Sequence, residues 1–382
     1  MTAIITTGTT ERTATRLIFA LGGIVLGAWA PLVPLAKERL GIDEGMLGLL
    51  LLCMGLGSIL AMPATAFLTS RLGCRQVITG SAAGLCLIFP VLSLAQSTWL
   101  MALSLIAFGI VMGCTSVAMN LQAVLVEKME GKTLMSGFHA MFSLGGIIGS
   151  GAMALLLALG VHAPLAALAI SLTMAGLLLS ARPGLLPFSN PGTSRPPAFV
   201  IPQGVVLAIG GLSLLAMLAE GAVLDWGALF IVEAQPADFA LAGFGYTAFA
   251  ITMTLGRLCG DRCRTAIGDL AMLVTSALVA TAGLAISLCL PWAVAILGGF
   301  LLVGAGVSNI APILFTLAGR SRTMPPNLAV ASVLTVGYVG IIAGPAAIGF
   351  IAHATSLRAA FLLLCAAMAL IALTARPIYR RL

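Results

Sequence analysis

Long apolar runs constrain this chain more than any other feature of its sequence. Each run holds about twenty residues with little charge, the length that crosses a ~30 Å hydrocarbon core as an α-helix. The strands of a membrane β-barrel would instead give ~10-residue segments of alternating polarity. We therefore expect an all-α membrane protein with twelve transmembrane helices, at about residues 15–36, 45–68, 76–95, 100–126, 133–160, 164–181, 204–232, 239–258, 269–290, 293–318, 328–352 and 358–375.

Composition excludes a soluble protein. Charged residues make up 8% of the chain and apolar residues 60%, and the mean hydropathy is +1.14. A soluble domain carries about 25% charged residues, so this chain cannot cover itself with a polar surface, and its solvent is lipid. The net charge of +7 does not indicate a nucleic-acid partner, because the basic residues lie singly at the ends of the apolar runs.

The positions of Lys and Arg predict the orientation in the membrane. With twelve spans, 16 of the 19 basic residues fall on the side of both termini, and only Lys37, Arg39 and Arg358 fall on the other. Lys and Arg accumulate in cytoplasmic loops, so we expect both termini in the cytoplasm. The polar first residues lead directly into a run of spanning length, which predicts a transmembrane helix rather than a cleaved signal peptide.

The eight cysteines do not indicate a metal site. Cys259 and Cys263 are four residues apart, but no His or further Cys lies near them to complete a set of ligands. We expect all eight to be small core residues, and we expect no cofactor.

A proline-rich segment divides the chain near its middle. Residues 182–203 hold six prolines, and such sequence forms a semi-extended linker. We therefore predict an N-terminal six-helix bundle at 1–181, a cytoplasmic linker at 182–203, and a C-terminal six-helix bundle at 204–382.

The two halves echo each other at an offset near 190 residues. The matched positions are Arg71 with Arg262, Asn120 with Asn309, and Gly146-Ile147-Ile148 with Gly340-Ile341-Ile342. Because the matches occur in the same order, they predict two pseudo-symmetric bundles that face a central pathway and rock against each other.

Six spans, a long loop, six more spans, and basic turns after spans 2 and 8 resemble the major facilitator superfamily. The first turn reads Ser70-Arg71-Leu72-Gly73-Cys74-Arg75, and the second reads Gly260-Asp261-Arg262-Cys263-Arg264. The resemblance implies that these turns latch a cytoplasmic gate, through Arg71, Arg75, Asp261, Arg262 and Arg264. The first turn has Ser70 where the family has an Asp, so we expect Asp261 and its arginines to form the stronger latch.

A narrower resemblance is carried by two segments. They read MNLQAVLVEKMEGKTLMSGFHAMFSLGGIIGS at 119–150 and AEGAVLDWGALF at 219–230. They are similar to a bacterial subgroup of sugar-permease-like transporters, most of which are uncharacterised. The resemblance implies a multi-pass protein of the bacterial cytoplasmic membrane and leaves the substrate open.

Two carboxylates interrupt the seventh run. Glu220 lies ~16 residues, or about 24 Å of helix, from the start of the run. An acid at such depth typically serves protons, ions or a substrate; the alternative is a structural partner for a basic or hydroxyl group. Asp225 is ~140° round the helix from Glu220. It is either a second proton-coupling acid or a solvated, capping or gate-pairing acid near the outer end.

Other polar residues within the runs are weaker candidates. Asn120 and Asn309 either contact the substrate or form hydrogen bonds between helices. His139 could relay protons, because histidine titrates near physiological pH, or it could donate to a helix backbone. Trp29, Tyr246 and Tyr338 could wall a substrate site or pack in the core. Trp226, beside Asp225, is either a further substrate contact or an interface aromatic.

These features favour a secondary active transporter over other classes. There is no Walker A sequence, so an ion gradient or the solute's own gradient supplies the energy. Because no Lys or Arg is expected deep in a span, we predict a small neutral or cationic solute, imported with protons by a monomer. Export of a drug or toxic metabolite by proton antiport is the alternative. An enzyme is disfavoured because H-E-x-x-H and G-x-S-x-G are absent, and a sensor because no soluble domain is expected.

Overall fold

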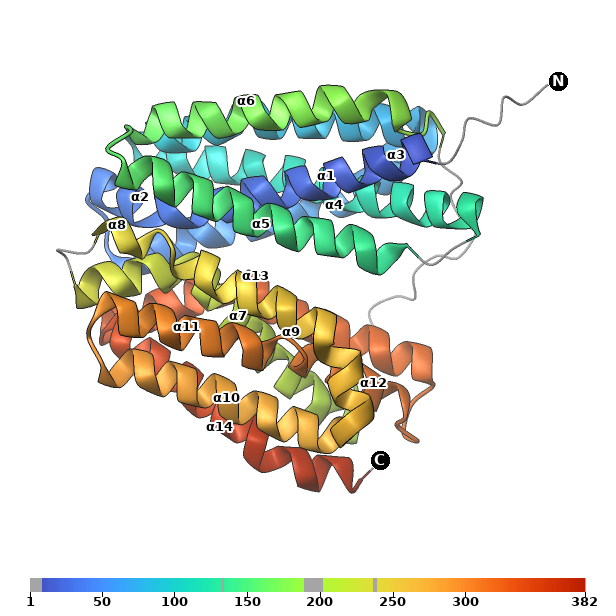
Figure 1. Cartoon of the computed structure of the whole chain (residues 1–382), viewed down its shortest axis with the longest axis vertical. Coiled ribbons are helices and arrows are strands. Elements are labelled where there is room, and N and C mark those ends of the chain that lie inside the picture. Colours follow the sequence, from blue (N-terminus) through green and yellow to red (C-terminus); the bar gives the residue numbers. More distant parts are fainter. Residues whose placement is uncertain (1–8, 132–133, 189–201, 236–238, 382) are drawn as a thin grey trace. The chain divides into compact units, whose positions relative to one another are not determined.

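The computed structural model describes residues 9–131, 134–188, 202–235 and 239–381. These residues form helices and connecting turns without a strand (Figure 1), which confirms the predicted all-α fold. Among them, eleven helices are long and apolar enough to cross a membrane. The predicted eighth span corresponds to α9 (Gly245–Ile267), which is less apolar because it contains four charged residues, Arg257, Asp261, Arg262 and Arg264.

The chain divides into two compact units. Unit 1 comprises Met1–Gly41 and Cys53–Ser194. Its helix α1 packs closely against α5 and α6. The elements of this part of the chain are α1 (Thr9–Trp29), η1 (Ala30–Leu32), α2 (Val33–Leu40), α3 (Glu44–Leu94), α4 (Thr98–Glu130), α5 (Met135–Ala158), α6 (Ala163–Ala181) and η2 (Arg182–Gly184).

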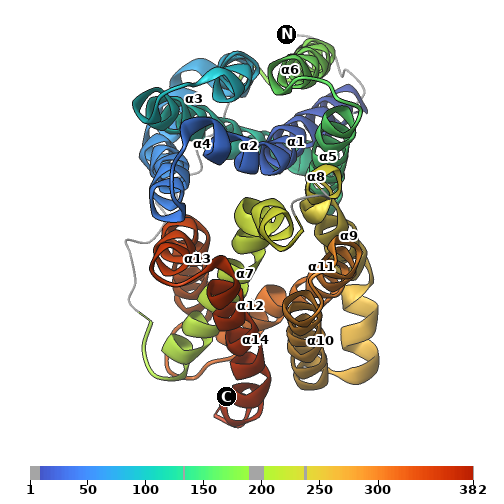
Figure 2. The same cartoon turned by 90° about the vertical axis from the view of Figure 1, so that its left-hand side faces the viewer.

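Unit 2 comprises Arg195–Leu382 together with Ile42–Leu52, the segment that begins α3. The sequence analysis placed residues 42–52 with the N-terminal bundle. Within unit 2, α7 packs against α13, and α10 lies beside α11 (Figure 2). Its remaining elements are α7 (Val205–Ala234), α8 (Phe239–Ala242), α9, α10 (Asp269–Cys289), α11 (Ala293–Val307), α12 (Ile310–Gly319), α13 (Pro326–Ala354) and α14 (Leu357–Tyr379).

A sharp break at Gly73 divides α3 into the predicted second and third spans. The backbone of Gly73 has φ 81° and ψ 166°, a conformation that glycine adopts far more readily than other residues. The carbonyl oxygen of Pro187 lies where a Cβ atom would be placed. The first basic turn is therefore a tight reversal that requires glycine, with no separate loop.

The repeated Gly-Ile-Ile segments are explained by close packing of helices. In unit 1, a Cβ atom at Gly27 of α1 would overlap the carbonyl oxygen of Gly146 on α5. In unit 2, a Cβ atom at Gly340 of α13 would overlap the carbonyl oxygen of Leu214 on α7. Small residues let membrane helices approach to backbone contact, so these glycines fix the same kind of packing in both units.

The structure describes only part of the predicted linker. Residues 189–201 of the predicted linker lie outside the described residues, whereas 182–184 form η2.

The expectation that all eight cysteines are core residues is wrong for Cys259, Cys263 and Cys289, which are exposed. A thiol is only weakly polar, so it costs little on a helix face that contacts lipid.

Candidate functional site

A carboxylate–guanidinium pair joins the middle of α7 to the middle of α9. Nη2 of Arg257 lies 3.4 Å from both carboxylate oxygens of Glu220. The side chain of Glu220 is 29% exposed and that of Arg257 is 44% exposed. Contacts of this length and exposure give a weak ion pair, of about 0–1 kcal/mol. The two side chains can therefore separate at small cost.

Arg257 was not among the residues that the sequence predicted to form a site. The predicted span ended at 258, which put Arg257 at its cytoplasmic end. In the structure α9 begins at Gly245 and continues to Ile267, since this segment contains no proline and its two internal glycines do not end the helix. Arg257 therefore lies near the centre of the helix, where it provides the basic partner that was the alternative interpretation of Glu220.

Asp225 has a different environment from Glu220 on the same helix. Its side chain is 4% exposed, and its Oδ1 atom has no hydrogen-bond partner within the described part of the chain. Burial of a carboxylate oxygen without a hydrogen-bond partner costs free energy. The interpretation of Asp225 as a solvated or capping acid is therefore wrong, because the residue is buried and α7 continues beyond it to Ala234.

Tyr246 connects the two acids. It lies in the first turn of α9, and Glu220, Arg257 and Asp225 all lie close enough to act on its hydroxyl group electrostatically. Its ring stacks on that of Phe249, with centroids 6.1 Å apart. The structure thus pairs Glu220 with Arg257 and places both, together with Asp225, within electrostatic reach of Tyr246.

The other predicted aromatic residues differ in exposure. Trp29 in unit 1 and Trp226 in unit 2 are fully buried, and neither indole N–H has a partner among the described residues. The burial of Trp226 excludes its interpretation as an interface aromatic. Tyr338 of α13 is 51% exposed, so its ring is available for contact.

The paired asparagines have different partners. Asn309 is buried between α11 and α12, and its Nδ2 donates to the Gly256 carbonyl of α9 (2.8 Å) and to the Ser308 hydroxyl (2.9 Å). Asn120 is partly exposed and donates to the Ser116 carbonyl of its own helix (2.8 Å). Asn309 therefore holds two helices together, whereas the carboxamide oxygen of Asn120 is free of any partner in the described structure.

His139 belongs to unit 1. It is exposed near the start of α5, and its ring meets that of Phe19 edge to face, with centroids 5.3 Å apart. The structure leaves its role in proton coupling as a prediction.

The predicted gate residues fall into three environments. Arg75 donates to the Leu185 and Pro183 carbonyls (2.7 and 3.1 Å), which fastens the end of α6 to α3. Arg71 lies over the Phe67 ring, 5.0 Å from its centroid, and Arg262 is exposed. The side chain of Asp261 lies outside the described residues.

Arg264 forms an ion pair with Asp269, an acid that was not predicted from the sequence to belong to the site. Its Nε lies 2.9 Å from Asp269, and Arg320 approaches the other carboxylate oxygen of Asp269 at 2.9 Å. Nη2 of Arg264 also donates to Thr316 (3.1 Å). Asp269 lies shortly after the basic turn, at the start of α10, and this position was the signal that the sequence offered. The sequence offered no signal for Arg320, because its contact with Asp269 depends on tertiary structure.

The fold and the charged cluster define a polytopic membrane protein of the transporter class. Among the described residues, no group of three His, Cys, Asp or Glu side chains could hold a metal ion. The family model described as Major Facilitator Superfamily matches residues 15–327, and the chain belongs to this family of transporters. Its members are generally not enzymes. The resemblance inferred from the sequence is confirmed.

Relatives extend over almost the whole chain. An uncharacterised MFS-type transporter of Yersinia pestis is 47% identical over 98% of this chain and 97% of its own length. The membrane protein MosC of Rhizobium meliloti is 31% identical over 94% of this chain and 88% of its own length. Neither name identifies a substrate.

Solved structures share the fold at low identity. The nucleoside transporter NupG superposes with a TM-score of 0.75 at 14% identity, covering 97% of this chain and 99% of that chain. A bacterial homologue of the human lysosomal transporter Spinster gives a TM-score of 0.76 at 12% identity, covering 99% and 98%. At these identities the likeness shows the fold alone.

Proposed function

We propose that the protein is a proton-coupled secondary transporter that imports a small neutral or cationic solute by alternating access. The Glu220–Arg257 pair carries this proposal. It is a partly exposed ion pair between the middle of α7 and the middle of α9, and intramembrane ionisable residues typically mark substrate or proton pathways. Because the pair is weak, a proton or a cationic group can replace Arg257 at Glu220.

The neighbouring groups suit proton transfer. In the proposed cycle, protonation of Glu220 neutralises it and releases Arg257, and loss of the proton restores the pair. Asp225, buried without a partner for Oδ1, provides a second site that can hold a proton. Tyr246 lies within electrostatic reach of both acids and can relay protons between them. His139 is the corresponding candidate in unit 1.

The charges of the cluster support the proposed solute class. Glu220 and Arg257 cancel, and Asp225 adds either no charge or one negative charge. An anionic solute would therefore meet no uncompensated positive charge here. We propose solute contacts for Tyr338 and Asn120, which have accessible polar or aromatic groups. Trp29, Trp226 and Asn309 are buried, so they would contact a solute only after their helices move.

The proposal also includes the movement of the two bundles, the oligomeric state and the orientation in the membrane. We propose that the bundles at 1–181 and 204–382, joined by the linker 182–203, move against each other as rigid bodies. The chain acts as a monomer in the bacterial cytoplasmic membrane, with both termini in the cytoplasm. The basic turns, with Arg71, Arg75, Asp261, Arg262 and Arg264, close the cytoplasmic side. The placement of 16 of 19 basic residues on one side supports this orientation.

Export by proton antiport remains the second candidate, because a carboxylate that alternately binds a cation and a proton also performs antiport. The direction of the proton flux separates the two. When a solute is added outside proteoliposomes that contain a pH-sensitive dye, a symporter acidifies the lumen. An antiporter running in reverse makes it alkaline.

Glu220→Gln tests the proposal. A thermal-shift screen of the purified protein against metabolites first identifies a stabilising solute. In proteoliposomes, we expect Glu220→Gln to abolish uptake driven by a pH gradient while exchange of labelled solute at equal pH persists in part. Glu38→Gln, which changes an exposed acid on α2, is the matched control and should behave as wild type. Gradient-driven uptake that survives in Glu220→Gln would remove Glu220 from the coupling mechanism.

A further inference from the structure

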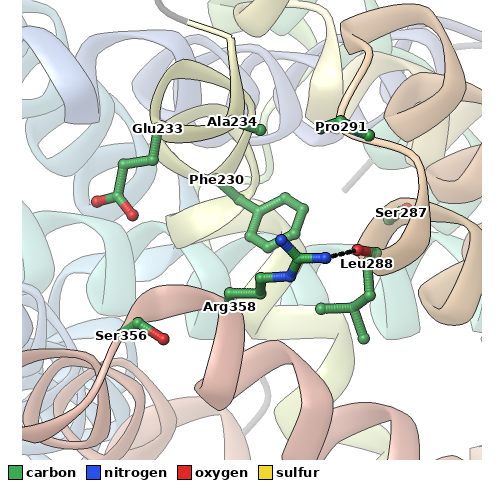
Figure 3. A pocket seen from close by; sticks show the side chains of 8 residues that line it. All are labelled: Phe230, Glu233, Ala234, Ser287, Leu288, Pro291, Ser356 and Arg358. Atoms are coloured by element: carbon green, nitrogen blue, oxygen red, sulfur yellow. Dashed lines mark hydrogen bonds between the residues drawn. The ribbon is translucent and has the colours of Figure 1, made fainter.

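A second site with charges of both signs lies away from the Glu220–Arg257 pair. The last turns of α7 and α10 and the first turn of α14 enclose a pocket of about 260 Å³ (Figure 3). Glu233 of α7 and Arg358 of α14 line it, with Phe230, Leu288 and Pro291 as its apolar walls. None of the residues predicted from the sequence to form a site lies in it.

Arg358 presents an unneutralised guanidinium to this pocket. Its Nη2 donates to the Leu288 carbonyl at 2.5 Å. In the described part of the chain, no carboxylate lies within ion-pair distance of it. A guanidinium has five N–H donors, so most of them remain for an anionic ligand. Carboxylate and phosphate groups are the anions that a guanidinium binds in a bidentate manner.

Arg39 in unit 1 shows what a purely structural arginine looks like in this protein. Its Nε and Nη2 donate to the Ala95 and Leu92 carbonyls at 2.8 and 2.7 Å, at the end of α3. Both side chains thus cap the C-terminal end of a helix, where a cation is favoured. Arg39 uses two nitrogens on carbonyls, whereas Arg358 uses one and faces a pocket.

The rest of the pocket supplies a negative group and a rigid apolar wall. Figure 3 shows the carboxylate of Glu233 and the guanidinium of Arg358 on different walls of the pocket. The Phe230 ring is fixed by stacking on Phe361, with centroids 4.3 Å apart. A ligand that contacts both charged side chains carries a cation and an anion separated by a short linker.

We propose that this pocket binds a small zwitterion, with its carboxylate or phosphate on Arg358 and its ammonium group at Glu233. Two sources share this chemistry: a free amino-acid-like solute and the phosphoethanolamine headgroup of a lipid. Trp292, next to Pro291, is 62% exposed, and exposed tryptophans concentrate at the membrane–water interface. Both sources can reach that depth. The inference does not rest on the proposed transport function.

Calorimetry on the purified full-length protein tests the site. The probes are O-phosphoethanolamine and glycine as zwitterions, and inorganic phosphate and ethanolamine as single charges. We expect at least one zwitterion to bind about tenfold more tightly than either single charge, because each charged hydrogen bond contributes about a factor of ten. Arg358→Gln and Glu233→Gln should each remove that advantage. Arg39→Gln and Glu38→Gln should not.

Native mass spectrometry separates the two sources. If soluble zwitterions do not bind, but phosphatidylethanolamine stays on the wild type and is lost from Arg358→Gln and Glu233→Gln, the ligand is the lipid headgroup. Binding of a soluble zwitterion to lipid-free protein identifies a free solute. If the protein binds neither a soluble zwitterion nor phosphatidylethanolamine, the proposal is overturned. It is also overturned if phosphate and O-phosphoethanolamine bind with equal affinity and Glu233→Gln changes neither affinity. Glu233→Gln remains informative if Arg358→Gln fails to fold.

Discussion

Glu220 and Asp225 lie on one uninterrupted helix, yet among the described residues Glu220 has an ionic partner and is partly exposed, whereas Asp225 has neither property. Glu220 is 29% exposed beside Arg257, whereas Asp225 is 4% exposed and its Oδ1 is unpaired within the described chain. Five residues of regular helix turn the two side chains ~140° apart. The same element therefore presents an acid that exchanges partners readily and an acid whose charge the structure disfavours.

Asp225→Asn should leave the protein stably folded. The amide has nearly the shape of the neutral carboxyl group that burial favours, so we expect the Tm to stay within about 2 °C of wild type. Exchange of labelled solute at equal pH should persist, and uptake driven by a pH gradient should fall. A Tm lowered by ten degrees would instead mean that Asp225 is ionised and held by a partner.

Asp269→Asn should destabilise unit 2 because one carboxylate neutralises both Arg264 and Arg320. The Arg264 side chain is 20% exposed, and we expect its loss of a partner to cost about 1–3 kcal/mol. Arg320 is 53% exposed, so Arg320→Gln should cost less than about 1 kcal/mol. Thermal unfolding measures both.

Arg262→Gln is the control for that comparison. Arg262 is an exposed neighbour of Arg264 in the same basic turn and should leave the Tm unchanged. A loss of stability in Arg262→Gln equal to that in Asp269→Asn would show that the turn depends on overall charge rather than on the Asp269 contacts.

Asn309→Ala should cost more stability than Asn120→Ala. The first change breaks a buried bond between helices and leaves the Gly256 carbonyl without its donor, at about 1–3 kcal/mol. The second breaks a bond within one helix at a partly exposed position, and should cost about 0.5 kcal/mol. Equal shifts in Tm would contradict the difference in their structural roles.

Gly149→Ala should destabilise unit 1, whereas Gly137→Ala on the same helix should not. A methyl group at Gly149 would overlap the Ile24 carbonyl of α1, whereas nothing lies within 4 Å of the corresponding point at Gly137. Overpacking costs about 1–3 kcal/mol, and alanine gains up to about 1 kcal/mol over glycine in a helix. Chemical or thermal unfolding of the two variants should therefore shift in opposite directions.

The fold could be predicted from the sequence because lipid permits so few solutions. Twenty-residue apolar runs form helices whatever their neighbours, so the class and the order of the elements followed from the sequence. The end of the helix in the eighth run could not be predicted in this way. Arg257 resembled a terminal charge because hydropathy falls there, although the helix continues to Ile267.

The site was only partly accessible from the sequence. Glu220, Asp225 and Tyr246 were found because acids and aromatic residues deep in apolar runs are conspicuous. Their relation to Arg257 was missed because a contact across 37 residues has no local signal. The different states of Glu220 and Asp225 depend on which side of α7 the neighbouring helices cover. That is a property of packing, so the sequence did not predict that Asp225 is buried.

The break at Gly73 has an evolutionary consequence. Its backbone angles and the adjoining Pro187 carbonyl leave no room for a side chain, so this position has a single acceptable amino acid. A library of all substitutions at residue 73, selected for correctly inserted protein, should return glycine codons alone. The exposed residues 70 and 72 nearby should tolerate a range of replacements.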